Sequence, residues 1–176
     1  MKDTKKEPWH FAKTAYSSAK GEWDTPKDMI RYLSDYFTFD LDPAASAANV
    51  CKKYYTENDN GLIKPWHGLV WLNPPYGRIG KIGLWIARAR DHGDKKDCAA
   101  VCLVPARVDT KWWQNNISAA TQVTFIKGRL KFGGVVNSAP FPSAFIVFGE
   151  ITPHQRQALA NYGWSVYFKQ SSFDFK

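Results

Sequence analysis

The chain has 176 residues, of which 44% are hydrophobic and 15% are aromatic. This composition excludes a disordered chain and is sufficient for one buried core. The formal net charge of +8 favours a polyanionic partner. No apolar run approaches membrane-spanning length and no signal-peptide core follows the basic start, so we expect a cytoplasmic protein without a membrane partner. We expect a basic N-terminal segment over residues 1–20 and a single domain over residues 21–176.

The cysteines and histidines are scattered along the chain. Cys98 and Cys102 lie inside an apolar run, and Cys51 stands alone. The histidines form no HxxxH or HxH pair, so we expect no metal site and no Cys–His nucleophile. The motifs GxSxG, GxxxxGK[ST] and GxGxxG are also absent. The chemistry should therefore need neither a metal nor a protein nucleophile.

The first half of the chain predicts one helix and three strands. Asp24 or Thr25 is expected to cap the helix, with Pro26 in its first turn. Alternating apolar residues predict the first strand, and an unbroken apolar run predicts that the third is buried. The helix is expected over Lys27–Tyr36, and the strands over Phe37–Asp42, Lys53–Thr56 and Leu69–Leu72.

The second half continues the alternation of helices and strands. Helices are expected over Ile79–Ala89, Lys111–Ala120 and Pro153–Asn161, and strands over Ala99–Val104, Val123–Ile126, Leu130–Phe132, Ala144–Phe148 and Trp164–Phe168. The alternation predicts an α/β fold with a single mixed, mostly parallel sheet flanked by helices. Ligands gather beyond the carboxyl ends of strands in such sheets, and Asp42, Asn73 and Arg107 each follow a predicted strand. We expect these three side chains to border one crevice.

The segment Asn73-Pro74-Pro75-Tyr76 directly follows the buried strand that ends at Leu72. Asn73 offers a side-chain carbonyl, the prolines offer main-chain carbonyls without competing amide donors, and Tyr76 offers a flat aromatic face. These groups suit a planar substrate that carries an NH2 group. An ordinary turn is the alternative interpretation, because Asn-Pro and Pro-Pro are common in turns.

Two earlier segments also have a functional and a structural interpretation. Thr25-Pro26 alone is a common helix start. Asp42-Pro43 could simply end a strand, but a carboxylate there could also bind a cationic amino group or a ribose hydroxyl. The small residues that follow Asp42 would let a ligand approach the backbone.

Taken in order, these segments resemble the phage-type DNA N6-adenine methyltransferase (Dam) family, which uses S-adenosylmethionine. The resemblance runs from about Trp23 to Phe148. Its motifs are Thr25-Pro26, Asp42-Pro43-Ala44-Ala45, Trp71-Leu72-Asn73-Pro74-Pro75-Tyr76-Gly77, Leu103-Val104-Pro105-Ala106-Arg107, Gly128-Arg129-Leu130 with Phe132, and Pro142-Ser143. It implies a Rossmann-like methyltransferase fold and methyl transfer from S-adenosylmethionine to a flipped-out adenine of double-stranded DNA. It also implies a bacterial host cell.

The resemblance implies roles for the motif residues. The implied catalytic residues are Asn73, Pro74, Pro75 and Tyr76, and the implied cofactor-binding residues are Trp23, Thr25, Pro26, Asp42, Pro43, Ala44 and Asn73. The chain departs from the usual methyltransferase pattern where Pro43-Ala44-Ala45-Ser46 replaces a glycine-rich loop, a substitution that the phage-type family shares. The acidic residue that would hold the cofactor ribose is open, with Glu57, Asp59 and Asn60 as candidates.

We expect the Asn73 side-chain oxygen and the Pro74 carbonyl to accept the two N–H groups of the target amine. Tyr76 would stack on the target base. Basic residues near the crevice would contact phosphates, and Trp112 or Trp113 would act as a wedge or stacking residue, although such side chains often belong to a solvated face or to the core. The expected nucleic-acid contacts are Arg78, Lys81, Arg107, Lys111, Trp112, Lys127, Arg129 and Lys131.

Other functions remain open from the sequence. A methyltransferase that acts on RNA or on a protein glutamine would use the same Asn-Pro-Pro-Tyr segment. A DNA-binding module without turnover would keep the same fold. The recognition sequence and the oligomeric state are also open, and we expect loops to supply specificity because no separate recognition domain is evident.

Overall fold

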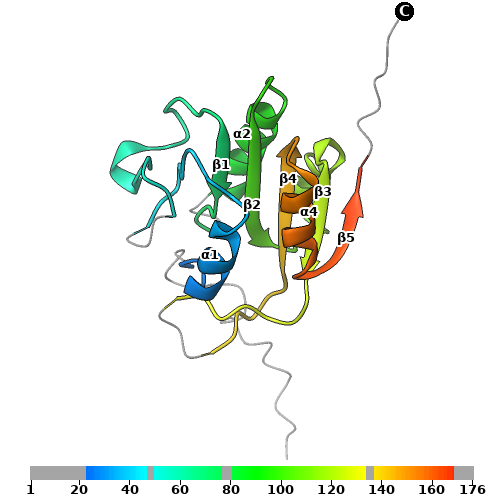
Figure 1. Ribbon diagram of the computed structural model, residues 1–176. Coiled ribbons are helices and arrows are strands. Elements are labelled where there is room, and N and C mark those ends of the chain that lie inside the picture. Colours follow the sequence, from blue (N-terminus) through cyan, green and yellow to red (C-terminus); the bar gives the residue numbers. More distant parts are fainter. Residues whose placement is uncertain (1–22, 47–49, 77–80, 134–136, 169–176) are drawn as a thin grey trace, which may run out of the picture.

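The computed structural model describes residues 23–46, 50–76, 81–133 and 137–168, which form a five-stranded sheet with helices on both faces (Figure 1). The expected basic segment over residues 1–20 lies outside the described residues. The helices are α1 (Lys27–Ser34), α2 (Ile82–Gly93), α3 (Lys111–Gln114) and α4 (Pro153–Ala160), with 3-10 turns η2 (Glu57–Asp59) and η3 (Ile117–Ala119). The strands are β1 (Leu69–Leu72), β2 (Ala99–Pro105), β3 (Gln122–Ile126), β4 (Ser143–Gly149) and β5 (Gly163–Tyr167).

The strands are ordered β1-β2-β4-β3-β5 in one mixed sheet. The prediction of an α/β fold with a single mixed sheet is confirmed, but the prediction that the sheet is mostly parallel is wrong. Only β1 and β2 pair in parallel, whereas β2–β4, β3–β4 and β3–β5 are antiparallel. The reason is that β4 starts at the edge of the sheet where β3 ends and inserts between β2 and β3. Its direction is therefore opposite to that of both neighbours. The apolar patterns specified which segments are strands and not their directions.

The carboxyl ends of β1, β2 and β3 meet at one edge of the sheet, at the bottom of Figure 1. The parallel pairing sets Leu72 beside Cys102, so Asn73 emerges at this edge. The segment that joins β3 to β4 passes below the same edge. Most of the candidate side chains follow one of these strand ends.

Beyond β1, the described part of the chain continues the sheet as isolated bridges. Leu41 pairs in parallel with Val70, and Asp42 pairs in parallel with Tyr54. The predicted strands Phe37–Asp42 and Lys53–Thr56 are therefore too long. At the start of β1 the Asp40 carboxylate, rather than a strand carbonyl, accepts a 2.7 Å hydrogen bond from the Leu69 amide, which interrupts the ladder.

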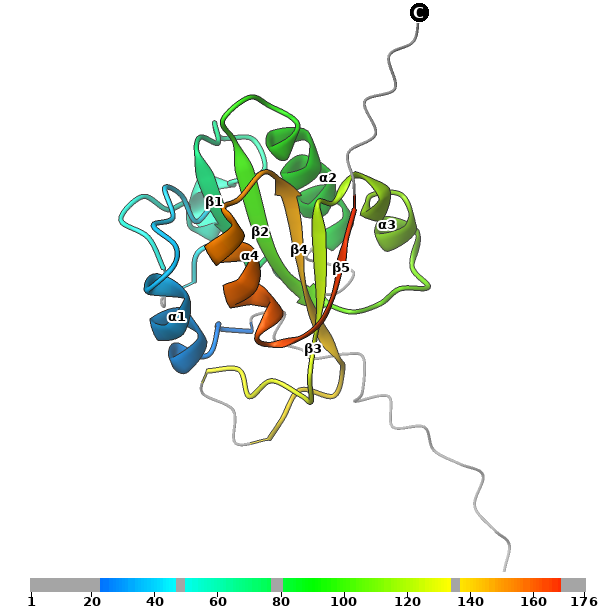
Figure 2. The ribbon, with the colours of Figure 1, turned by 45° about the vertical axis from the view of Figure 1, so that its right-hand side comes forward.

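Helices cover the two faces of the sheet. Figure 2 shows α4 in front of the strands and α2 behind them. α1 lies beside α4. The two are connected by a 2.8 Å hydrogen bond that Asn161, which follows α4, donates to the Tyr32 hydroxyl of α1. β2 and β4 are buried along their whole length, as a central strand pair covered on both faces should be. Among the described residues, no helix is long and apolar enough to cross a membrane.

Several element boundaries differ from the sequence prediction. α1 ends at Ser34, and its N-cap residue is Pro26, without a side-chain cap. α3 has a single turn, after which the Asn116 side chain donates to the Trp112 carbonyl at 2.7 Å. The predicted strand Leu130–Phe132 is wrong, since this segment turns its apolar side chains into the core instead of pairing in the sheet.

Candidate active site

Asn73 is held by hydrogen bonds to a segment far away in the sequence. Its side-chain Nδ2 donates to the Trp23 carbonyl at 2.6 Å and to the Thr25 hydroxyl at 3.0 Å. A primary amide has two N–H groups, so both are satisfied. The side-chain oxygen Oδ1 is thereby turned the other way, which fixes it as the acceptor. Thr25, expected as a helix cap, is instead 5% exposed and orients Asn73.

The acceptor oxygen of Asn73 faces the hydroxyl group of Tyr76. This hydroxyl lies 2.7 Å from Asn73 Oδ1 and 3.1 Å from the Leu103 carbonyl on β2. A hydroxyl has one proton, so it can donate to one of these acceptors while remaining near the other. Burial raises the pKa of Tyr76 well above its ordinary value, so the group stays a donor at neutral pH. Tyr76 therefore satisfies Asn73 when no substrate does.

Four aromatic side chains, Trp23, Tyr76, Phe132 and Phe141, form a cluster around this hydrogen bond. Trp23 contacts Phe132 and Phe141 with ring centroids 5.3 Å away in each case. Tyr76 lies edge-on to the same two rings, at 6.1 Å and 5.7 Å. The Tyr76 ring is thus enclosed and 6% exposed. Its stacking on a base would require one ring face to be uncovered, and that role stays a prediction.

The sequence patterns did not indicate that Phe132 and Phe141 belong to the site. Each is an apolar residue in a loop, and apolar type alone indicates only the core. The signal lies in the pattern before Phe132, where Arg129 and Lys131 are exposed while Leu130 is half-buried and Phe132 is buried. Such an alternation anchors a basic segment beside Tyr76.

Asp42 is a buried carboxylate beside β1. It is 4% exposed, and burial raises its pKa to about 7, although hydrogen bonds from the amides of Ala44 and Val50 oppose the shift. The hydrogen bond from Ala44 measures 3.2 Å. A buried carboxylate with a raised pKa is stabilised by a cationic ligand, which would favour its charged form. The Trp71 amide donates to the carbonyl of Leu41 at 3.0 Å, which places Asp42 next to β1, the strand that Asn73 follows.

The segment around Pro43 is closely packed. A Cβ atom added at Gly61 would lie 1.9 Å from the Pro43 carbonyl oxygen, so only glycine fits there. Close by in the sequence, Asp59 accepts hydrogen bonds from the Thr56 amide at 2.8 Å and from the Thr56 hydroxyl at 2.7 Å. These bonds lower the pKa of Asp59 and cap η2. Glu57, Asp59 and Asn60 are all exposed, and the ribose contact stays a prediction for the three of them.

The structure groups the expected nucleic-acid contacts in two places. Lys81, Arg107 and Trp112 line one hollow of about 410 Å³, and Lys111 is exposed on the adjacent helix α3. The other expected basic contacts that the structure describes are exposed on the segment that follows β3. They are Lys127, Arg129 and Lys131. Arg78 lies outside the described residues.

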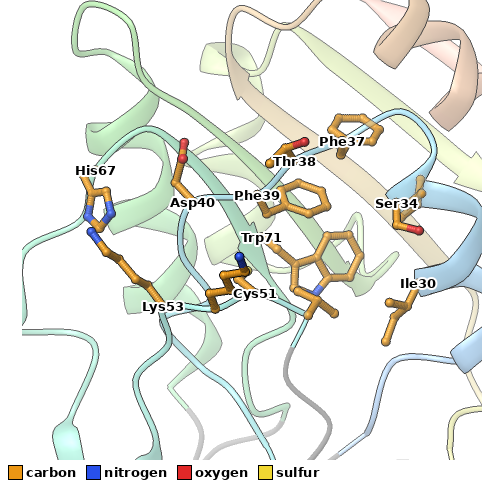
Figure 3. A pocket seen from close by; sticks show the side chains of 13 residues that line it. Ile30, Ser34, Phe37, Thr38, Phe39, Asp40, Cys51, Lys53, His67 and Trp71 are labelled. Carbon is orange, nitrogen blue, oxygen red and sulfur yellow. The ribbon is translucent and has the colours of Figure 1, made fainter.

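The larger hollow, about 490 Å³, adjoins Asp42, because it is lined by Val50, whose amide hydrogen-bonds to Asp42 (Figure 3). Its floor is aromatic, with Phe39 above Trp71, and α1 forms one wall through Ile30. His67 and Lys53 lie side by side at the other end. None of the expected cofactor residues lines this hollow directly.

Comparison with known proteins identifies the family. A family model described as DNA N-6-adenine-methyltransferase (Dam) matches residues 12–147. The chain belongs to this family. A protein of Escherichia phage T1 named DNA N-6-adenine-methyltransferase is 36% identical to this Dam-family chain over 113 residues, which are 61% of this chain and 45% of the phage protein. The chain thus matches less than half the length of that relative. The Dam match includes Trp23, Asp42, Asn73 and Phe141, which lie in the segments that form the site.

Among the described residues, no three His, Cys, Asp or Glu side chains lie close enough to hold a metal ion. Cys51, Cys98 and Cys102 are free thiols, and burial raises the pKa of Cys51 to about 12. Burial also raises the pKa of Cys102. These two thiols are therefore protonated at neutral pH and poor nucleophiles.

Proposed function

We propose that this protein is a DNA adenine N6-methyltransferase that transfers a methyl group from S-adenosylmethionine to the exocyclic amine of an adenine flipped out of double-stranded DNA. The observation that carries the proposal is the fixed amide of Asn73. Its Nδ2 is used by Trp23 and Thr25, so Oδ1 presents an acceptor at the end of β1. Membership of the Dam family supports adenine in DNA as the substrate.

We also propose that the fold is the Rossmann-like fold of S-adenosylmethionine-dependent methyltransferases. The parallel bridges of Leu41 and of Asp42 extend the parallel part of the sheet on the side of β1. Asp42 then lies at the end of a parallel segment beside β1, and such folds bind their ligand beyond the ends of parallel strands.

The residues around Asn73 fit S-adenosylmethionine. The cofactor carries an amino group that is cationic at neutral pH, and the buried Asp42 carboxylate is of the type that such a group would stabilise. Trp23, Thr25 and Pro26 would hold the same end of the molecule, next to the small residues Pro43 and Ala44. When bound, the cofactor supplies a methyl group attached to a positively charged sulfur.

The protein's own contribution to the reaction is hydrogen bonding to the target amine. An aromatic NH2 is a weak nucleophile because its lone pair is delocalised into the ring. Asn73 Oδ1 and the Pro74 carbonyl would accept its two N–H groups and concentrate electron density on nitrogen. The proton can leave after transfer, so no strong base is needed. Tyr76 would release Oδ1 and keep the Leu103 carbonyl as its partner, since that oxygen is already 3.1 Å from its hydroxyl.

Lys127, Arg129 and Lys131 are exposed on the segment that carries Phe132 to the site, and they would contact DNA phosphates. Such contacts offset the few kcal/mol that flipping a base costs.

The proposal is tested by measuring transfer of a labelled methyl group from S-adenosylmethionine to unmethylated duplex DNA, to RNA and to a glutamine-containing peptide. Label in DNA alone is expected. Label only in RNA or only in the peptide would show that the protein methylates a different amine. Binding of S-adenosylmethionine, measured by calorimetry, distinguishes a wrong substrate from a module without turnover, which would bind DNA and no cofactor.

A further inference from the structure

The hollow of about 410 Å³ between α2 and the segment after β2 is lined by residues other than those of the site around Asn73, which we call the Asn73 centre. Lys81 and Leu84 come from the start of α2, Pro105 and Arg107 from the end of β2 and the loop after it, and Trp112 from α3. We call this hollow the Trp112 pocket.

The Trp112 pocket depends on close packing of α2 against α3. A Cβ atom added at Gly83 would lie 3.0 Å from Trp112 Cβ, tighter than an ordinary contact. The loop beside it is braced, because the Thr110 hydroxyl donates to the Arg107 carbonyl at 2.7 Å. Trp112 is held edge-on to the buried Trp113, with ring centroids 5.6 Å apart. The pocket is therefore a built feature of the fold.

The lining combines cationic and apolar side chains. Lys81 and Arg107 are basic, and none of the described residues that line the pocket is acidic. Leu84 is 55% exposed, and Val108, next to Arg107 in the sequence, is 46% exposed, so apolar atoms also reach the surface there. A nucleotide has the matching chemistry, with an anionic phosphate and a flat base that packs on aromatic and aliphatic side chains.

The position of the pocket relates it to the reaction centre. Pro105 lines the pocket and ends β2, the strand whose Leu103 carbonyl lies 3.1 Å from the Tyr76 hydroxyl. The Asn73 centre, by contrast, contacts Trp23 and Thr25. A DNA strand that delivers an adenine to Asn73 would thus have a second pocket close to its path.

We propose that the Trp112 pocket binds an unstacked nucleotide of the DNA near the flipped adenine, with the base against Trp112 and Leu84 and the phosphate against Lys81 and Arg107. This inference rests on the proposed function. It adds a second site for the same DNA and assigns it to Trp112 and Leu84 rather than to the catalytic segment.

The test compares the affinities of full-length variants for an unmethylated DNA duplex by fluorescence anisotropy. Trp112→Ala is expected to bind about 5- to 100-fold more weakly, because stacking of a base on an aromatic side chain contributes on that scale. Trp112→Phe should recover most of the loss. Trp164→Ala, which removes a 71% exposed tryptophan of β5, is the matched control and should bind as the wild type does.

A second variant separates binding from folding, because Trp112 is half-buried and its loss could disturb α3. Leu84→Glu adds a negative charge at an exposed position of the pocket, so the fold should be retained and the affinity for DNA should fall at least fivefold. Lys95→Gln changes the net charge equally, just beyond the far end of α2, and should have a smaller effect.

The double substitution Lys81→Gln with Arg107→Gln should reduce the slope of log affinity against log salt by about 2. The matched pair Lys95→Gln with Lys96→Gln should leave the slope unchanged. If the wild type methylates DNA while Trp112→Ala and Leu84→Glu bind as tightly as their controls, the pocket assignment is overturned and the proposed function stands. A wild type that binds DNA through this pocket without methylating it would retain the assignment and reject the proposed function. Failure to bind DNA at all would overturn both.

Discussion

The Tyr76 hydroxyl lies 2.7 Å from Asn73 Oδ1, the oxygen that we propose accepts a hydrogen bond from the target amine. The same hydroxyl is 3.1 Å from the Leu103 carbonyl, so a second acceptor is at hand. Substrate and Tyr76 would therefore exchange at Asn73 without leaving a buried donor unsatisfied. This relationship leads to the first prediction.

Tyr76→Phe removes the hydroxyl and keeps the ring. The free energy of unfolding should fall by about 1 kcal/mol, because the single hydrogen bond that the buried hydroxyl donates is lost. Methyl transfer should stay within about tenfold of the wild type, and the KM for DNA should not rise, since the competitor for Asn73 Oδ1 is gone. Chemical denaturation and steady-state kinetics measure these effects. A rise in KM with unchanged kcat would show that the hydroxyl itself binds DNA.

Thr25 should act on the reaction through Asn73. Thr25→Val has nearly the same shape but cannot accept the hydrogen bond from Asn73 Nδ2, so the amide would be less well fixed. We expect kcat to fall about tenfold, more than the affinity for S-adenosylmethionine does.

Thr25→Ser restores the hydroxyl and is the matched control. It should recover most of kcat. Equal losses in Thr25→Val and Thr25→Ser would assign the effect to the lost methyl group and would contradict the positioning role.

Asp42 should make both stability and cofactor binding depend on pH. Its pKa is raised from 3.8 to about 7, so between these pH values the folded protein holds a proton that the unfolded chain has lost. The stability contribution of Asp42 therefore falls as pH rises through this window, by roughly 2 kcal/mol between pH 5 and pH 8. Binding of a cationic group needs the charged carboxylate, so affinity for S-adenosylmethionine should rise with pH.

Asp42→Asn should remove this part of the pH dependence of unfolding and should weaken S-adenosylmethionine at least tenfold at pH 8. Denaturation and calorimetry at pH 5 and pH 8 test both points. An Asp42→Asn variant that binds the cofactor as tightly as the wild type would exclude Asp42 from the cofactor site.

Phe132 should support Tyr76 as well as the core. It is 1% exposed and contacts both Trp23 and Tyr76, so Phe132→Ala should lower the free energy of unfolding by about 3 to 5 kcal/mol. Phe132→Leu fills more of the space and should cost less. Denaturation of the two variants gives the comparison. A change below about 1 kcal/mol for alanine would show that the cluster is not part of the folding core.

The sequence predicted the parts of the site that follow directly from strand ends. The apolar run Leu69–Leu72 and the prolines after it located Asn73 at the edge of the sheet, and the parallel pair β1–β2 bears this out. It could not predict the hydrogen bond from Asn73 to Thr25, because a threonine before a proline is equally suited to capping a helix. The burial of Tyr76 also escaped prediction.

The remaining differences have related physical causes. Tyr76 is enclosed by Phe132 and Phe141, which lie much later in the chain, and no local pattern encodes such contacts. The sequence also could not predict the direction of β4, since the same apolar run occurs in parallel and in antiparallel strands. Short strands such as Phe37–Asp42 were overestimated because a side chain, that of Asp40, took a place in the ladder.

Asn73→Ala isolates the group on which the proposed chemistry depends. It removes the amide, so methyl transfer should fall at least 100- to 1000-fold, as when one fixed hydrogen-bonding partner of a transition state is lost. Affinity for S-adenosylmethionine should fall far less than transfer does, because Asp42 is untouched. The variant and the wild type are compared by calorimetry and by transfer of labelled methyl groups.

The most direct measurement is nucleoside analysis by mass spectrometry of duplex DNA after incubation with S-adenosylmethionine and either the wild type or Asn73→Ala. The proposed function predicts N6-methyldeoxyadenosine with the wild type and almost none with Asn73→Ala. A methylated nucleoside other than N6-methyldeoxyadenosine, or equal yields from the two proteins, would contradict it.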